Sequence, residues 1–358
     1  MKKNFLKNAC IACVSLLLLI AAFSGCSSSN TPTVVADQTK LTALADSCTS
    51  LLASSTVTTD YPAAAITAFQ TVLTATKTAA LTKSITQTAV DNLVVNLRAA
   101  ETTFLAAAYG AIPKTALLLG MTFDETVTGG QFTTEGKPLT AVLTAGPSQI
   151  FGTATNLPSF VTGKVGKAIY FSNGSHLEIS NYTASDFEGK TLSIAAWVKP
   201  DSTRAGNYII SLNYWNTWKF QLQEQNKPFF TVSTSVGGTD ADNQADNSAP
   251  NKAWTHLVVS MDLTAGTLTF YVNGASTMVW TSTTKPNLSG SVKTYANVLP
   301  MMIGACTTYA EANAVWTWSW AHTPVGWDGF IGAIDELKVY NIALTDGQVA
   351  KLYKDENK

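Results

Sequence analysis

Seven aromatic residues in two groups have side chains well suited to binding a ligand. They are Trp316, Trp318, Trp320 and Trp327 in one stretch and Tyr214, Trp215 and Trp218 in another. Alternate residues of an extended chain project to the same side, so Trp316, Trp318 and Trp320 can form one flat surface. Flat aromatic surfaces pack on the apolar faces of sugar rings. The spacing therefore predicts a carbohydrate-binding platform. The alternative is that these rings fill or cover a hydrophobic core.

Cys26 stands where an exported protein would be lipidated. Residues 1–25 have the pattern of an export signal, because three lysines precede an apolar run that ends in small residues. The exit resembles a bacterial lipobox, although Phe23 replaces the usual leucine. Lipidation of Cys26 would make it the new N-terminus, with residues 26–33 as a polar tether. By resemblance to sorting rules that retain proteins with Asp after the cysteine, Ser27 favours delivery to the outer membrane. The alternative is an ordinary signal peptide with an incidental cysteine.

The other reactive side chains favour neither zinc nor nucleophile chemistry. Beyond Cys26 the chain has Cys48 and Cys306, which lie in different predicted domains, and no Cys/His spacing suits zinc. None of the three histidines lies near a serine-nucleophile motif.

The chain has 23 basic and 24 acidic residues, and three of the basic ones belong to the export signal. Without a basic surplus, we expect no nucleic-acid partner.

The segment that follows the tether is predicted to be helical. Residues 34–109 contain no glycine and are rich in alanine, leucine and threonine. Asp37, Pro62 and the pair Ser84 and Gln87 are start signals for three helices. Three such helices form a small bundle, and their sequence resembles the FIVAR-type helical repeats of bacterial surface proteins.

Residues 116–353 change to a pattern of strands and turns. Apolar and polar residues alternate between glycine-containing turns, and 46% of the whole chain is hydrophobic, which is enough for a real core. The clearest strands are residues 191–201, 256–274 and 330–341. Thr345 and Gln348 form a capping box that predicts a short final helix. The segment is long enough for two sheets, so we expect an antiparallel β-sandwich.

Several segments of this region together carry a resemblance to a known family. They are LLLGMTFDE, GKAIYFSNGSHLEIS, LSIAAWVKP, WTHLVVSMD with GTLTFYVNG, IGA, and IDELKVYNIALTDGQVAKLY. Their order and spacing resemble the laminin-G-like, concanavalin A-like jelly-roll domains. The resemblance implies an all-β antiparallel jelly roll. With the small helical bundle that precedes it, we expect an α+β multidomain chain. It also implies binding of carbohydrate or protein, in some relatives with calcium.

Asp335, in the last of these segments, stands in an apolar row. A regular strand would place it on one face with Ile331, Ala333, Leu337 and Val339, so its carboxylate needs a buried partner. The resemblance to calcium-bearing relatives implies a Ca²⁺ site in which Asp335 joins Asp124 or carbonyl oxygens. The alternative is a carboxylate that accepts hydrogen bonds from backbone amides and pins the terminal strands. Both interpretations stay open, and calcium is the one cofactor that the sequence suggests.

The sequence disfavours catalysis. Glycoside hydrolases that this fold resembles use an ExDxxE motif, and in AIDELK both glutamates are missing, because Ala333 and Lys338 stand in their places around Asp335. We therefore expect a non-catalytic lipoprotein of the outer membrane, at the cell surface or on its periplasmic side. It would bind a polysaccharide or glycan for neighbouring uptake proteins. The alternatives are a protein-binding adhesion or structural module and, less favoured, a glycoside hydrolase.

Overall fold

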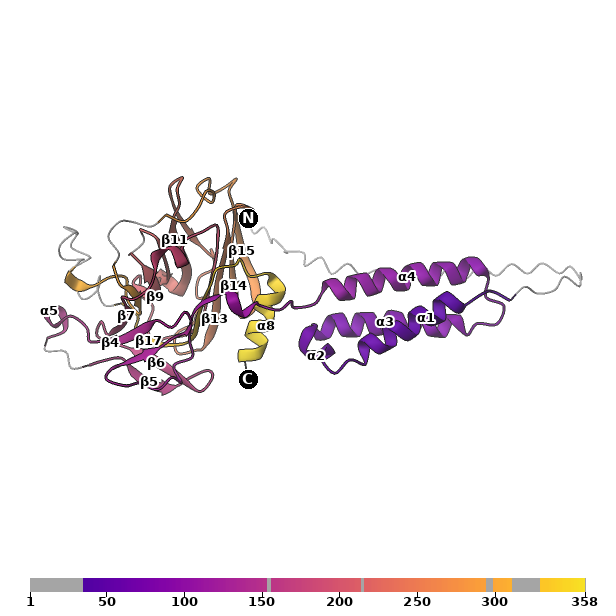
Figure 1. Cartoon of the computed structure of the whole chain (residues 1–358), viewed down its shortest axis with the longest axis horizontal. Coiled ribbons are helices and arrows are strands. Elements are labelled where there is room, and N and C mark those ends of the chain that lie inside the picture. Colours follow the sequence, from indigo (N-terminus) through magenta and orange to yellow (C-terminus); the bar gives the residue numbers. More distant parts are fainter. Residues whose placement is uncertain (1–34, 153–155, 214–215, 294–298, 311–328, 358) are drawn as a thin grey trace, which may run out of the picture.

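The chain folds into a helical bundle followed by a β-sandwich (Figure 1). The computed structural model describes residues 35–152, 156–213, 216–293, 299–310 and 329–357. Within these ranges, no helix is both long enough and apolar enough to cross a bilayer. The predicted lipidation site, Cys26, and the predicted export signal lie outside the described residues.

The bundle has its own apolar core. Its helices are α1 (Thr39–Leu52), α2 (Val57–Asp60), α3 (Ala63–Ala80) and α4 (Gln87–Ala106). The rings of Phe69 and Phe104 stack at 4.7 Å between centroids, and Leu44, Cys48 and Leu97 pack in the same cluster. Because this cluster contains no residue of the sandwich, the bundle does not depend on the sheets for its core. The predicted domain limits, 34–109 and 116–353, stay a prediction.

Two of the predicted helix starts lie close to the observed ones. Asp37 accepts a hydrogen bond from the backbone N–H of Thr39 at 2.9 Å, and Pro62 directly precedes α3. The third start differs, since Thr86 rather than Ser84 caps α4 and accepts from the N–H of Ala89 at 3.2 Å. Ser84 has a φ of 66°, so it lies in the preceding turn.

The first layer of the sandwich is, within the described residues, a nine-stranded antiparallel sheet. It runs in the order β15 (Ala275–Thr281), β14 (Thr267–Val272), β13 (Thr255–Asp262), β8 (Thr191–Pro200), β17 (Gly332–Tyr340), β1 (Leu117–Met121) and β3 (Glu135–Gly136). The hairpin of β5 (Ser159–Thr162) and β6 (Lys167–Phe171) joins the start of β17. That hairpin brings its turn close to Asp335.

The second layer is an eight-stranded antiparallel sheet of the described residues. Its order is β12 (Gly238–Asp242), β11 (Lys227–Ser233), β10 (Trp218–Gln223), β9 (Asn207–Leu212), β16 (Met301–Ile303), β7 (His176–Ile179), β4 (Thr140–Thr144) and β2 (Gln131–Thr133). A short helical turn, η1 (Lys114–Ala116), leads from the bundle into β1, and others connect strands at α5 (Ser148–Phe151), η2 (Ala184–Phe187) and η3 (Glu224–Asn226). One large apolar cluster fills the space between the two sheets. The predicted jelly-roll sandwich is confirmed.

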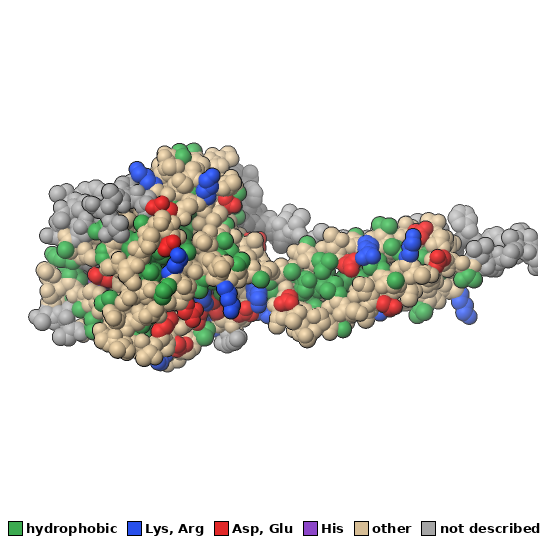
Figure 2. All heavy atoms as spheres, in the orientation of Figure 1, with side chains coloured by type: hydrophobic (Ala, Val, Ile, Leu, Met, Phe, Trp, Pro, Cys, Tyr) green, Lys and Arg blue, Asp and Glu red, His purple; other side chains and the backbone are tan. Residues whose placement is uncertain are grey.

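The last helix, α8 (Asp346–Glu356), covers the outer face of the nine-stranded sheet. The predicted capping box of Thr345 and Gln348 is present. Val349 packs with Ala195 of β8 and Val258 of β13 in a second, smaller apolar cluster. Figure 2 shows sparse charges over most of this view and a group of acidic and basic side chains where the sandwich meets the bundle.

The same helix also contacts the segments that lead out of the bundle. Gln348 donates to the carbonyl oxygen of Ala111 at 2.9 Å, and Lys354 donates to the carbonyl oxygen of Thr58. The N–H of Tyr109 donates to the carbonyl oxygen of Asp60 at 2.9 Å. These bonds place α8 between the two parts of the chain (Figure 1).

The register around Asp335 differs from a regular strand. Glu336 has a φ of 48°, and the pairing of β17 with β8 shifts between Asp335 and Lys338. This bulge brings Leu337 and Ile334 onto the core side. Asp335 pairs with Trp197 on the outer face. The prediction that Asp335 faces the same apolar row as Leu337 and Val339 is therefore wrong.

Candidate functional site

Most of the predicted aromatic platform lies outside the described residues. This is the case for Trp316, Trp318, Trp320, Trp327, Tyr214 and Trp215. The connections that contain these residues join β9 to β10 and β16 to β17. Because β9 and β16 pair antiparallel, with Met302 opposite Ser211 and Ile303 opposite Ile210, the last residues of these two strands lie toward opposite ends of the pair.

Trp218 is not a glycan-binding residue. Its side chain is fully buried in the cluster between the sheets, and its indole N–H donates to the carbonyl oxygen of Phe187 at 3.4 Å. The prediction that placed Trp218 with an exposed platform is corrected by this burial. The alternative interpretation, a core position, holds for this residue.

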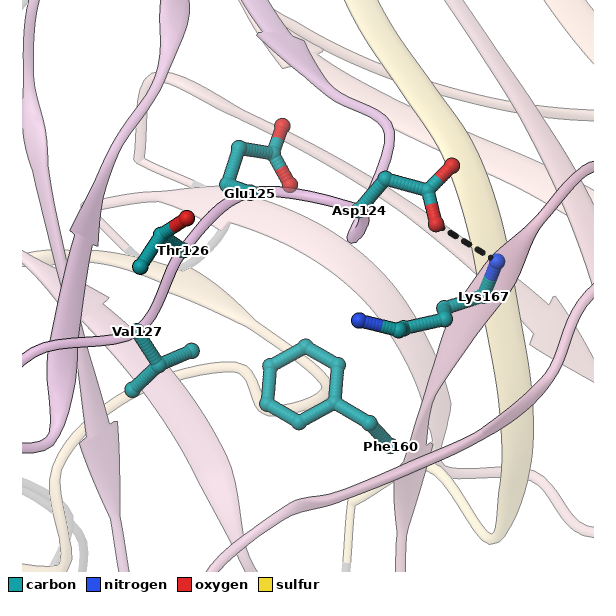
Figure 3. Close-up of a pocket in the computed structure, with 6 residues that line it drawn as sticks. All are labelled: Asp124, Glu125, Thr126, Val127, Phe160 and Lys167. Atoms are coloured by element: carbon teal, nitrogen blue, oxygen red, sulfur yellow. Dashed lines mark hydrogen bonds between the residues drawn. The ribbon is translucent and has the colours of Figure 1, made fainter.

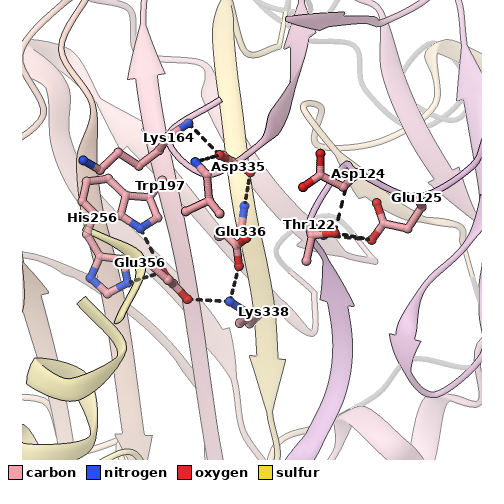
Figure 4. Close-up of polar contacts among 11 residues, drawn as sticks. Thr122, Asp124, Glu125, Lys164, Trp197, His256, Asp335, Glu336, Lys338 and Glu356 are labelled. Atoms are coloured by element: carbon pink, nitrogen blue, oxygen red, sulfur yellow. Dashed lines mark hydrogen bonds and ion pairs between the residues drawn. The ribbon is translucent and has the colours of Figure 1, made fainter. Parts of the chain in front are cut away.

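Asp335 accepts hydrogen bonds from three backbone amides. Oδ2 accepts from the N–H of Lys164 at 2.8 Å and of Val165 at 2.9 Å, while Oδ1 accepts from the N–H of Glu336 at 2.8 Å (Figure 4). Burial raises the pKa of Asp335 to about 7, and the amide donors, which favour the carboxylate, oppose this rise. Asp335 thus fixes the turn of the β5–β6 hairpin to β17.

Asp124 holds the other end of that turn. Its Oδ1 accepts from the N–H of Lys167 at 2.9 Å. Gly166 makes this approach possible, because a Cβ there would lie 2.1 Å from Asp124 Oδ2, and a Cβ on Gly163 would lie 2.5 Å from Asp335 Oδ2. The two carboxylates therefore clamp one turn from opposite sides.

The clamp does not have the ligand set of a calcium site. Calcium binds several oxygen atoms, whereas the groups that surround Asp335 are N–H donors. Among the described residues, no group of three or more His, Cys, Asp or Glu side chains could hold a metal ion. The amide-bonded interpretation of Asp335 matches the geometry, with the correction that its partner is the hairpin turn.

Next to the clamp lies a hollow of about 450 Å³ (Figure 3). Its walls are Asp124, Glu125, Thr126, Val127, Phe160 and Lys167. Figure 3 shows the ring of Phe160 and the side chain of Lys167 facing the segment that follows β1. Phe160 is half-buried and packs against the core, which fixes its ring at the hollow.

The hollow offers both free donors and free acceptors. Within the described part of the chain, neither the ammonium of Lys167 nor Oδ2 of Asp124 has a hydrogen-bond partner. Glu125 is fixed by Thr122, because its Oε1 accepts a hydrogen bond from the backbone N–H of Thr122 at 2.8 Å. An aromatic ring beside an acceptor and a donor suits a ligand with an apolar face and hydroxyl groups at its edge.

Sequence reasoning missed Phe160 and Lys167. The signal that could have found them is the GKVG turn of residues 163–166, because two glycines so close together indicate that another group approaches the backbone. The hollow combines this hairpin with the segment after β1, and only the fold brings the two together.

A separate group of buried charges lies beneath α8 (Figure 4). Glu356 accepts from the indole N–H of Trp197 at 2.8 Å and from the ammonium of Lys338, which also donates to Glu336. Burial raises the pKa of Glu356, and Lys338 opposes that rise. The group joins α8 to β8 and β17, so its role is structural.

His256 completes this group but is unsuited to acid–base catalysis. The ring is fully buried, and its Nε2 lies 3.7 Å from Oε2 of Glu356. Burial lowers the pKa of His256 to about 3, with Lys338 as a second cause, so the ring is neutral. Tyr353 of α8 covers it at 5.8 Å between ring centroids.

Comparisons with known proteins find one matching family and several similar solved structures. The family model of the concanavalin A-like lectin/glucanases superfamily matches residues 171–350. Domain 4 of AbnA, a GH43 extracellular arabinanase from Geobacillus stearothermophilus solved with arabinotriose, is similar, with 21% identity over 66% of this chain and 98% of that domain and a TM-score of 0.45. No curated protein matches the chain.

Two further binding-domain structures are also similar to it. The binding domain of Paraclostridial Mosquitocidal Protein 1 has 13% identity over 68% of this chain and 52% of its own, with a TM-score of 0.46. The binding domain of botulinum neurotoxin serotype G has 14% identity over 67% of this chain and 51% of its own, with a TM-score of 0.45. This chain thus spans about half the length of those toxin domains.

Proposed function

Because the chain belongs to the concanavalin A-like lectin/glucanases superfamily, we propose that it is a carbohydrate-binding protein whose hollow at Phe160 receives a sugar ring. The observation that carries the proposal is the fixed ring of Phe160 beside the unpartnered ammonium of Lys167 and the free carboxylate oxygen of Asp124. A sugar ring stacks on the phenyl face, donates a hydroxyl to Asp124 and accepts from Lys167.

The proposed role is binding rather than hydrolysis. A retaining or inverting glycosidase needs two carboxyl groups that reach opposite sides of the scissile bond. Asp335 stands at the central Asp position of the motif in AIDELK. It is fully buried, and its two carboxylate oxygens accept hydrogen bonds from three backbone amides. Its burial supports a structural role for this residue.

The proposed location is the outer membrane, through a lipid on Cys26. The lipobox-like exit and Ser27 support it. In this arrangement the helical bundle is a spacer, and the sandwich captures polysaccharide for neighbouring uptake proteins. Cys26→Ala should release the protein from the detergent-soluble membrane fraction or stall its processing. An equally membrane-bound variant would contradict the anchor without affecting the binding proposal.

Affinity electrophoresis in gels that contain arabinan, galactan, mannan or β-glucan tests the binding site. Phe160→Ala should weaken retention about fivefold in Kd, since a stacking ring contributes about 1 kcal/mol. Val161→Ala is the matched control, because Val161 is the next residue of β5, is 36% exposed and does not line the hollow.

Lys167→Ala separates binding from folding. Lys167 is exposed, and its contact with Asp124 uses the backbone N–H, which the variant keeps. It should lower retention with an unchanged melting temperature. If the native protein retains none of the neutral polysaccharides, or if both variants bind like the native protein, the hollow is not the site.

A further inference from the structure

A row of side chains crosses the outer face of the eight-stranded sheet, away from the hollow. Direct cross-strand pairs connect its members, which are Asp240, Thr231, Lys219, Ser211, Met302, Glu178, Val142 and Gln131. Side chains paired in this way share one face of the sheet. The residues beside them on β10, Trp218 and Phe220, point into the core, so this row is the opposite face.

Lys219 is the unusual member of the row, because it is a buried cation whose direct contacts are an amide oxygen and two aromatic rings. The residue is only 8% exposed. Its ammonium donates to the side-chain oxygen of Gln221 and lies 4.9 Å from the ring centre of Phe229 and 5.5 Å from that of Tyr208. Among the described residues, no carboxylate lies within ion-pair distance of it.

The nearest acid of the row is committed elsewhere. Asp240 accepts from the hydroxyl of Thr231 at 2.6 Å. Cys306, which also lies near Lys219, supplies no charge, because burial raises the pKa of its thiol to about 12. Burial also lowers the pKa of Lys219 itself. An amide oxygen and two rings solvate the ammonium, and Asp240 attracts it only from beyond ion-pair distance, so the charge has no direct anionic partner among the described residues, which is costly inside a protein.

The surroundings of Lys219 combine a cation with sugar-compatible groups. The rings of Tyr208 and Phe229 lie beside the ammonium, while the amide N–H of Gln221 donates to the carbonyl oxygen of Ala205 and the hydroxyl of Thr231 donates to Asp240. Thr231, the neighbour of Lys219 on the side of β12, is 7% exposed, and Asp240 beyond it is exposed, so the row is open at β12. A ligand that reaches this place meets a positive charge between aromatic rings.

We propose that this face is a second binding site, and that Lys219 pairs there with the carboxylate of a uronic acid residue in an acidic glycan. A uronic acid has both features that the site matches, since its ring has an apolar face for Phe229 or Tyr208 and its carboxylate neutralises the ammonium. The inference is independent of the proposed function, because no residue of the hollow belongs to this row.

Calorimetric titration with an oligogalacturonate and with its fully methyl-esterified form tests the charge pairing. The two probes differ only in the charge of the carboxyl groups, and a chelator in the buffer removes calcium effects. The native protein should bind the acid form at least tenfold more tightly than the ester, and this preference should weaken at high salt. Equal affinity for both probes, or no binding of either, would overturn the proposal.

Substitutions at Lys219 test whether the preference for the acid form depends on this residue. Lys219→Met removes the charge at similar length and should abolish the preference, while Lys219→Arg keeps the charge and should retain it. If Lys219→Met fails to fold, Lys219→Gln replaces it as the uncharged variant. The preference for the acid form should then be lost in Lys219→Gln and kept in Lys219→Arg. Val161→Ala, which lies outside both sites, must leave the preference unchanged. A preference that survives in Lys219→Met, or that disappears in Val161→Ala, would contradict the site.

Discussion

Each outer face of the sandwich carries a lysine that is largely shielded from water, and among the described residues one of the two has acidic partners. Lys338, on the nine-stranded sheet, donates to Glu336 and Glu356 beneath α8. Burial lowers its pKa, but the two carboxylates more than offset this effect and raise it. Lys219, on the eight-stranded sheet, has an amide and two rings instead, and burial lowers its pKa.

This difference separates a charge that holds the fold together from a charge that could pair with an external anion. A buried cation whose acids belong to the same chain is neutralised on folding, so it serves to hold elements in register. A buried cation without an acid keeps its attraction for an anion from outside. The same residue type therefore has opposite consequences on the two faces, and stability measurements can distinguish them.

Removing the acid partner of Lys338 should give the largest effect. Glu356→Ala leaves the ammonium with one carboxylate and leaves the indole N–H of Trp197 unpaired, so the free energy of unfolding should fall by about 3–5 kcal/mol. Chemical denaturation measures this loss. Asp355→Ala is the control, because that side chain is 53% exposed and pairs only with Lys351, a contact worth about 0.5 kcal/mol. Similar losses in the two variants would contradict the structural role of the buried group.

Two buried groups, His256 and Asp335, should change the stability of the protein in opposite directions as pH falls. The folded pKa of His256 is about 3, against 6.5 for the free side chain, so its contribution to stability is lost as pH falls through this interval. The folded pKa of Asp335 is about 7, against 3.8, so its contribution increases as pH falls through that interval. The two effects oppose each other over most of the acid range.

Single substitutions should expose each contribution. His256→Leu should make the protein more stable on acidification from about pH 7 to pH 5, and Asp335→Asn should make it less stable, with melting temperatures that move apart by about 2 °C or more. Calorimetric melting at several pH values measures both slopes. Slopes of the same sign in the two variants would show that one of the groups is solvated rather than buried.

The smallest effect is expected at the unpaired lysine. Lys219→Met replaces an uncompensated charge with an apolar side chain of similar length, so the free energy of unfolding should stay within about 1 kcal/mol of the native value or rise slightly. Chemical denaturation of Lys219→Met and Glu356→Ala under the same conditions compares the two losses of unfolding free energy directly. A loss above about 2 kcal/mol would mean that Lys219 is a structural cation and that the two faces do not differ.

Much of the fold could be predicted because its signals are local. Alternation along 191–201 and 256–274 indicated strands, and Thr345 with Gln348 marked the start of the final helix. The bulge at Glu336 could not be predicted, because a positive φ in a strand depends on the pairing with β8 and not on the residue type. One shifted residue was enough to move Asp335 to the other face.

The candidate sites could be predicted only in part. The aromatic spacing suggested a binding role for Trp218, although the alternation of Trp218, Phe220 and Leu222 in β10 is the pattern of a core-facing row. Asp124 and Asp335 were identified, but their common partner, the turn at residues 163–167, has no sequence signal that connects it to either. The uncompensated charge of Lys219 depends on which acids the fold leaves out of reach, and that is a property of the three-dimensional structure.

The position of α8 between the bundle and the sandwich has a mechanical consequence. Tension on the bundle reaches the sandwich by two routes, through the connector into β1 and through Gln348 and Lys354 into α8. The second route ends at Glu356, whose contacts distribute the load over β8 and β17. Two parallel attachments share a pulling force, so the sandwich should resist extension from its N-terminal side better than a domain held by a single strand.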